Sequence, residues 1–324
     1  MSKMTPALVA AALVASAVPT AAQDWPTRPL TIVVPYGPGS GADVLGRIIA
    51  PQMSESLGQP VIIENVPGGG GMIGSARVAK AAPDGYQSVI GTAGTHAQNQ
   101  FLYKNPPYQP SDFAPVVLIA DQPFVLITRK DLPVNNLQDF IAYAKANQNS
   151  LKYGSPGTGS AGHLACALFN NAIGADIIHV PYRGAAQAMT DLLAGVIDYQ
   201  CAVVAVVLPQ LDGKTIKPLA LLAPERSPFL PGIPSSAEQG LPDFDASTWN
   251  ALFLPKATPP AIVQKLNKAA VTAMQTPAVR DRLRSIGAEP PAGEQASVDY
   301  MTKLVASDVQ KWAAPIRAAN INIE

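Results

Sequence analysis

Residues able to bind an anion are concentrated in four short loops of this sequence. Glycine and hydroxyl side chains occur together in residues 39–41, 92–95 and 155–160, and residues 183–184 form the fourth loop. Each loop follows a β-branched run and precedes a helical pattern, so unpaired N–H groups and a helix dipole attract negative charge there. Taken alone, each loop is more typical of an ordinary capped turn. Their repetition predicts a site that captures a carboxylate with neutral dipoles.

Single side chains near these loops have both a ligand-binding and a structural interpretation. Asp43 can accept a hydrogen bond from a ligand amine or water, or it can stabilise its own helix start. Arg183 can pair with a carboxylate or remain a solvated loop residue. Tyr36 and Tyr182 can wall a cleft or pack in a core. The predicted ligand-binding residues are Tyr36, Ser40, Gly41, Asp43, Thr92, Thr95, His96, Ser155, Thr158, Gly159, Ser160, His163, Tyr182, Arg183 and Gly184.

Two histidines raise the question of catalysis. His96 and His163 each lie just inside a predicted helix, where histidine more often caps or fills space than contacts a ligand. Ser160 precedes His163 by three residues, so hydroxyl and imidazole share a helix face. The alternative function is therefore a secreted α/β hydrolase-like enzyme that uses Ser160 and His163. However, Thr158 occupies the first glycine of the G-x-S-x-G elbow, and we expect no enzyme.

No cofactor or metal site is expected. Residues 69–74 match G-x-G-x-x-G, but Pro67 separates them from the strand and no acidic residue follows at the required position. The three histidines and two cysteines lack the spacing of metal ligands. We interpret Cys166 and Cys201 as buried free thiols, although an oxidising compartment would permit a bond between them.

The elements that position these loops form two sets of strand–loop–helix units. The first set covers residues 30–50, 61–80 and 88–96, and the second covers residues 137–194. An apolar segment at 115–128 leaves the first set, and residues 249–254 return to it; Trp249 either flanks the cleft or anchors this return. The pattern predicts an α/β protein with two lobes and a ligand cleft between them. We expect lobe 1 at residues 23–121 plus 246–324 and lobe 2 at 122–245.

Composition limits the class of protein. The chain has 324 residues, 23 Lys+Arg against 23 Asp+Glu, 48% hydrophobic and 14% charged residues. This balance, with no basic run, argues against nucleic-acid binding, and the apolar fraction argues against disorder. Lys3, an apolar stretch and a small-residue run predict a signal peptide at 1–22, cleaved near Ala22; an N-terminal core helix is the alternative. We therefore expect a periplasmic, soluble protein.

Several motifs in order resemble those of one family. They are residues 34–43 (VPYGPGSGAD), 67–74 (PGGGGMIG), 94–99 (GTHAQN), 153–164, 180–184 (VPYRG), 191–195 (DLLAG) and Lys311–Trp312. Together they resemble the Bug family, the periplasmic substrate-binding proteins of tripartite tricarboxylate transporters. The resemblance spans nearly the whole mature chain.

The resemblance implies a type II periplasmic-binding-protein fold, or Venus flytrap, that closes on a small organic anion. It implies a receptor that delivers a mono-, di- or aromatic carboxylate to membrane transporter subunits, or that acts as an orphan sensor component, and is a monomer. Loops 36–43 and 155–163 would hold the carboxylate. This sequence departs from the family pattern at residues 37–41 and at Cys201-Ala202-Val203, where many members have a polar run. A less polar far wall implies a ligand with an apolar or aromatic body.

Overall fold

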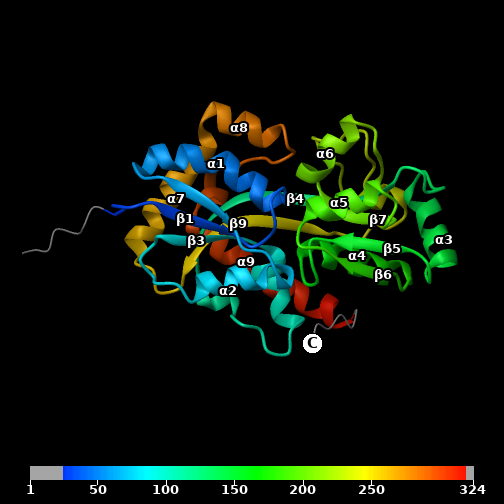
Figure 1. Ribbon diagram of the computed structural model, residues 1–324, viewed down its shortest axis with the longest axis horizontal. Coiled ribbons are helices and arrows are strands. Elements are labelled where there is room, and N and C mark those ends of the chain that lie inside the picture. The colour runs from blue at the N-terminus through cyan, green and yellow to red at the C-terminus, as the bar shows by residue number, and fades with distance from the viewer. Residues whose placement is uncertain (1–24, 319–324) are drawn as a thin grey trace, which may run out of the picture.

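The computed structural model describes residues 25–318, which form two α/β lobes joined by two long strands (Figure 1). The signal peptide predicted at residues 1–22 lies outside the described residues. The strands are β1 (Leu30–Val34), β2 (Val61–Asn65), β3 (Gln87–Thr92), β4 (Phe113–Arg129), β5 (Lys152–Ser155), β6 (Ile178–Pro181), β7 (Tyr199–Val203), β8 (Ile216–Leu221) and β9 (Ser247–Pro255). The α-helices are α1 (Gly41–Leu57), α2 (Met72–Ala79), α3 (Leu137–Asn147), α4 (Ala161–Ile173), α5 (Ala185–Leu193), α6 (Val204–Asp212), α7 (Pro260–Gln275), α8 (Pro277–Arg284) and α9 (Val298–Ala318). No helix among residues 25–318 is both long enough and apolar enough to span a bilayer.

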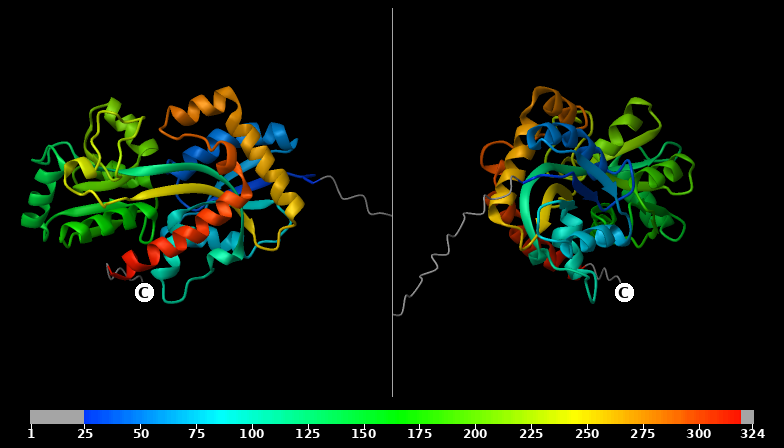
Figure 2. Two further views of the ribbon diagram at one scale, coloured as in Figure 1. Left: turned by 180° about the vertical axis from the view of Figure 1, so that it is seen from behind. Right: turned by 60° about the vertical axis from the view of Figure 1, so that its left-hand side comes forward.

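The strands form one hydrogen-bonded path through both lobes. Its order is β2-β1-β3-β9-β4-β7-β5-β6, and β8 pairs with β4 off this path. Within each lobe the strand–loop–helix units pair in parallel: β1 with β2 and β3, and β5 with β6 and β7. The crossing strands β4 and β9 run antiparallel to each other and to their neighbours. Figure 2 shows both strands passing from one lobe to the other.

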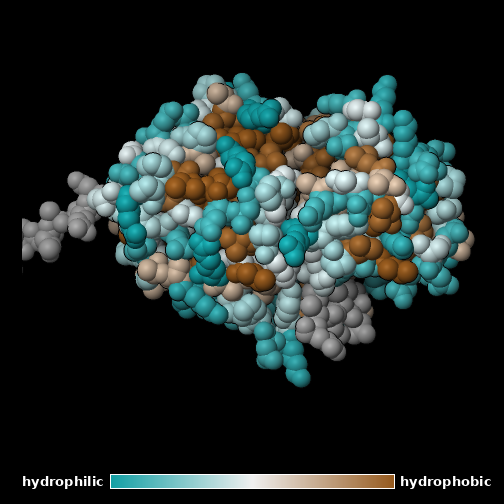
Figure 3. Space-filling view, in the orientation of Figure 1, coloured by the Kyte–Doolittle hydropathy of each residue, from teal (hydrophilic) through white to brown (hydrophobic). Residues whose placement is uncertain are grey.

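In each lobe, helices pack on both faces of its part of the sheet. Along β1, Ile32 packs in a cluster with α1 and α7, whereas Val33 faces the opposite cluster with α2 and α9. Along β4, Leu126 and Ile127 likewise face opposite clusters of the second lobe. Strands buried on both faces explain why the sequence shows continuous apolar runs instead of alternation. On the face shown in Figure 3, apolar side chains form scattered patches among hydrophilic ones.

The predicted crossings and most predicted elements are confirmed, with three differences. The loop after β3 does not start an α-helix: Gly94–Gln98 is a five-residue π-helical turn, η2, followed by a 3-10 turn. Helix α6 was not predicted, because its run of valines resembles a strand. The prediction of free thiols was wrong: Cys166 of α4 and Cys201 of β7 form a disulfide, with Cα atoms 5.5 Å apart.

Trp249 anchors the return crossing to the last helix. Its indole Nε1 donates a 2.7 Å hydrogen bond to Asp308 on α9, and its ring packs 5.9 Å from Phe253 between centroids. The side chain is 3% exposed. Of its two predicted roles, the structure shows the anchor.

Candidate functional site

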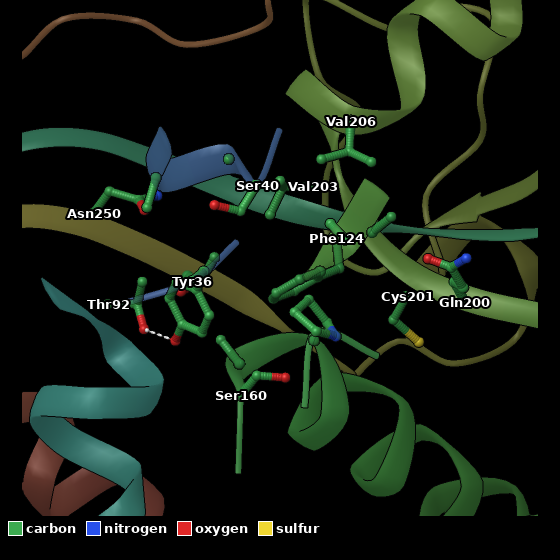
Figure 4. Close-up of a pocket in the computed structure, with 18 residues that line it drawn as sticks. Tyr36, Ser40, Thr92, Phe124, Ser160, Gln200, Cys201, Val203, Val206 and Asn250 are labelled. Carbon is green, nitrogen blue, oxygen red and sulfur yellow. Dashed lines mark hydrogen bonds between the residues drawn. The ribbon is translucent and has the colours of Figure 1, made fainter. Parts of the chain in front are cut away.

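A small hollow, with an accessible volume of about 60 Å³, opens where the two lobes meet (Figure 4). The strands and helix starts of both lobes contribute to its wall. The lining residues are Tyr36, Ser40, Gly41, Ala42, Thr92, Phe124, Pro156, Ser160, Ala161, Gly162, Ala185, Gln200, Cys201, Ala202, Val203, Val206, Thr248 and Asn250.

The starts of α1 and α4 form matching parts of this wall, one from each lobe. Ser40 and Ser160 are the N-caps, and each side chain accepts a hydrogen bond from the N–H three residues later. The first two N–H groups of each helix belong to Gly41, Ala42, Ala161 and Gly162, all of which line the hollow. They have no hydrogen-bond acceptor within residues 25–318. Four unpaired amides and two helix N-termini therefore belong to residues that line one space, which suits an anion.

Five of the predicted residues line the hollow: Tyr36, Ser40, Gly41, Thr92 and Ser160. The hydroxyls of Tyr36 and Thr92 lie 3.1 Å apart and are hydrogen-bonded. Burial raises the pKa of Tyr36 to about 12, so the phenol stays protonated and can donate. Tyr36 has both predicted roles: it lines the hollow, and at 5% exposed it belongs to the core cluster of β1, α1 and α7.

Asp43 lies behind the α1 start and not in the wall. Its carboxylate accepts hydrogen bonds from Gly39 N–H (2.9 Å), Arg47 Nε (3.0 Å) and Asn65 Nδ2 (2.9 Å). Burial alone would raise its pKa, but these donors hold the pKa below the ordinary value. Asn65 also donates to the carbonyl of Tyr36, so this network fixes the loop that precedes α1. Asp43 thus has the structural role.

Thr95 and His96 fill the core beneath Thr92. Thr95 Oγ1 accepts from Thr92 N–H and lies 2.8 Å from His96 Nδ1. The imidazole of His96 is stacked on Phe253, with 4.0 Å between centroids. It is fully buried, and burial lowers its pKa to about 3. His96 is therefore neutral, and its position supports a packing role.

The remaining predicted residues of the 155–163 loop lie behind the α4 start. Ser155 Oγ donates to the Gly157 carbonyl and lies 2.7 Å from His179 Nε2. His163 Nδ1 accepts from Gly159 N–H (3.2 Å), and burial lowers the pKa of His163 to about 4. Ser160 Oγ accepts from His163 N–H instead of contacting its ring. This geometry does not form the Ser160–His163 pair that a hydrolase would use.

Thr158 and Gly159 contact the other lobe. A Cβ placed on Gly70 would collide with the carbonyl oxygen of Thr158 and lie 2.7 Å from the carbonyl carbon of Gly159. The main chains of loops 69–71 and 157–160 therefore touch directly. These two residues join the lobes and do not line the hollow.

Arg183 and Gly184 form a second contact between the lobes. The carbonyl of Arg183 accepts a 3.1 Å hydrogen bond from Gly37 N–H, and a Cβ on Gly184 would lie 3.2 Å from Gly37 Cα. The guanidinium side of Arg183 is exposed. Tyr182 donates to Asp191 (2.7 Å) and does not line the hollow. This loop contacts the other lobe through its main chain, and neither Tyr182 nor Arg183 lines the hollow.

Sequence reasoning missed much of the wall. Thr248 and Asn250 alternate along β9 and share a face, a period that could have identified them. Phe124, Gln200 and Val206 belong to β4, β7 and α6 and gave no signal before the lobes were assembled. Cys201, Ala202 and Val203, noted as a departure from the family pattern, do form part of the wall.

Comparisons with known proteins agree with this arrangement. The model of the tripartite tricarboxylate transporter family receptor matches residues 45–321. A UPF0065 protein from the TAR-I ttuE-ttuC' intergenic region of Agrobacterium vitis is 37% identical over 323 residues, which cover 98% of this chain and 93% of that protein. Two solved structures from Rhodopseudomonas palustris are also similar. MatC with bound malate is 35% identical with a TM-score of 0.88, covering 90% of this chain and 100% of its own. Rpa4515 with adipate is 37% identical with a TM-score of 0.87, covering 92% and 99%.

Proposed function

Because this chain belongs to the tripartite tricarboxylate transporter receptor family, we propose that it is a receptor that captures a small organic carboxylate between its lobes. The observation that carries this proposal is the convergence of four unpaired helix-start amides, two from each lobe, on one hollow. Hydrogen bonds from such N–H groups to a carboxylate are charge-assisted and strong. The malate of MatC and the adipate of Rpa4515 support this chemistry, since both are small organic acids.

The mechanism that we propose is hinge closure. Residues 23–121 plus 246–324 form one moving unit and residues 122–245 the other, joined by β4 and β9. A carboxylate held by α1 of one unit and α4 of the other favours the form in which the lobes touch. The Gly37–Arg183 hydrogen bond and the Gly70–Thr158 contact belong to that form. Binding of this kind requires no covalent step, and we propose that the chain is not an enzyme.

The cellular context is part of the proposal. The signal peptide at 1–22 directs the chain to the periplasm, with cleavage near Ala22. There the protein works as a monomer and delivers its ligand to membrane transporter subunits, or it reports ligand as an orphan sensor component. Of the predicted ligand-binding residues, Tyr36, Ser40, Gly41, Thr92 and Ser160 contact the ligand, and those behind the wall position them.

Removal of single caps tests this proposal. Ser40→Ala and Ser160→Ala each remove a hydroxyl at the hollow, and each is expected to weaken carboxylate binding by about 1–2 kcal/mol. Ser297→Ala is the matched control, because Ser297 Oγ accepts from Tyr300 N–H at the start of α9, away from the hollow. Titration calorimetry with organic acids and with their uncharged amides measures the effect.

The control separates binding from helix stability. All three variants lose a serine cap and are expected to lose similar unfolding free energy, about 1 kcal/mol. Only the variants at 40 and 160 lose affinity, and only the acids bind. Equal affinity for acids and amides would contradict the proposed carboxylate receptor.

A further inference from the structure

The wall of the hollow carries no charged side chain. The lining residues include no Asp, Glu, Lys, Arg or His. Arg183 contributes only its carbonyl to the lobe contact, and its side chain is exposed. His163, behind the wall, is neutral because burial lowers its pKa to about 4. The charge of a bound anion is therefore balanced by main-chain dipoles and neutral hydrogen-bond donors alone.

The dipoles of the two serine-capped helix starts match one carboxylate. A helix N-terminus carries about half a positive charge, so α1 and α4 together supply about one. A second buried carboxylate would need a partner of its own. Helices α5 and α6 also begin at the hollow and add dipoles of their own, but the side chains there are the apolar Ala185, Val203 and Val206. Neither helix has a side-chain oxygen at its cap, unlike Ser40 and Ser160.

Apolar side chains adjoin both serine-capped helix starts. Val203 Cγ2 lies 3.0 Å from the place that a Cβ on Gly41 would occupy. Around the corresponding place on Gly162 lie Pro156 Cδ and the Cys201 carbonyl oxygen, both at 3.2 Å, and Phe124 Cε1 at 3.8 Å. The carbon atoms next to a carboxylate held by these amides would therefore contact Val203 and Phe124, and the wall continues to Val206 (Figure 4).

Gln200 places a buried polar group without a partner along this wall. Gln200 is 2% exposed and lines the hollow, and its Nε2 has no hydrogen-bond acceptor within residues 25–318. A buried amide donor without an acceptor costs free energy, so an acceptor from the ligand would be favourable. An amide N–H is satisfied by a neutral oxygen and supplies no net charge for an anionic one.

We infer that the ligand is a monocarboxylate with an apolar aliphatic or aromatic body and at most a neutral acceptor, such as a carbonyl or hydroxyl, that reaches Gln200. This inference rests on the proposed function and narrows it. Malate and adipate, found in the two relatives, each have two carboxyl groups, so the ligand class of this chain differs from theirs.

Matched pairs of acids test the inference by titration calorimetry. Butanoate, hexanoate, octanoate and benzoate are each compared with the diacid of the same chain length or ring: succinate, adipate, suberate and terephthalate. The best monoacid is expected to bind at least tenfold more tightly than its diacid. If the diacid binds at least as tightly as the monoacid in all four pairs, the inference is overturned, whereas the proposed carboxylate receptor remains supported. No binding by any of the eight acids overturns the proposed function and the inference with it.

A cation placed on the wall gives a second test. The monoacid that binds most tightly is compared with its paired diacid. Val206→Lys is expected to strengthen binding of that diacid at least tenfold and to weaken binding of the monoacid. Val196→Lys is the matched control, because Val196 is 52% exposed and does not line the hollow. If Val206→Lys does not fold, Val206→Gln replaces it and is expected to weaken the monoacid at least threefold. An unchanged monoacid-to-diacid ratio in the folded variant overturns the assignment of this wall.

Discussion

The contact between Gly37 and Gly184 allows lobe closure to be tested with one substitution at Gly184. Gly184 has an extended backbone (φ −177°, ψ 164°) that any residue adopts, so only the neighbouring lobe requires glycine there. In Gly184→Ser, the new Cβ lies 3.2 Å from Gly37 Cα and 3.4 Å from Gly37 N, closer than comfortable packing. Serine also suits the N-cap of α5, so the helix start is not weakened.

The expected loss of affinity depends on how much of the overpacking is relieved when the lobes open. Overpacking costs about 1–3 kcal/mol, and lobes that are free to separate keep the cost near the lower end. A penalty of about 1–2 kcal/mol on the closed form alone weakens carboxylate binding about 5- to 30-fold. The unliganded protein avoids the contact by opening, so its melting temperature is expected to change little.

Calorimetric titration and thermal unfolding of the same samples measure both quantities. Gly232→Ser is the matched control, because nothing lies within 4 Å of a Cβ at that position. An unchanged dissociation constant for folded Gly184→Ser would refute the idea that this contact belongs to the ligand-bound form. A large loss of melting temperature without ligand would show that the contact supports the fold instead of closure.

Two further predictions concern stability. The pKa of His96 is about 3 in the folded protein and 6.5 in the unfolded chain. Between these pH values only the unfolded chain binds the proton. The unfolding free energy therefore falls as pH drops below 6.5, by about 1.4 kcal/mol per pH unit for this group. His96→Phe is expected to reduce that slope by this amount in urea unfolding between pH 6 and 4, and an identical slope would contradict it. Replacement of Cys166 and Cys201 together by alanine is expected to cost about 2–4 kcal/mol of unfolding free energy. Denaturation curves that coincide with those of the parent would show that the bond does not contribute.

The fold was largely predictable because local signals agree with tertiary packing. Leu30–Val34 and Val61–Asn65 are strands with the bounds that the apolar runs indicated, and Pro260 marks the start of α7. The errors occur where local and tertiary preferences differ. The valine-rich α6 follows β7 without a turn residue, and packing against β4 and β8 overrides its strand-like composition. The cysteine pair lies 35 residues apart, and only the assembled lobe brings α4 against β7.

The candidate site was predictable only as far as its helix starts. Ser40 and Ser160 each precede a helical pattern, as an N-cap does, and the structure places both at the hollow. Asp43 and His163 occur in the same loops but do not line the hollow. Their polar atoms instead accept hydrogen bonds from main-chain N–H groups of those loops. Phe124 and Gln200 come from strands whose sequence gives no indication of which end faces the other lobe.

The crossing strands determine how this molecule can move. β4 and β9 remain paired from Phe113 with Pro255 to Pro123 with Ser247, interrupted by two register shifts. A rotation of one lobe must therefore twist this ladder, since among residues 25–318 only these two paired strands join the lobes. Because paired strands have a preferred twist, we expect the ladder to return to that twist when ligand leaves and so to reset the receptor.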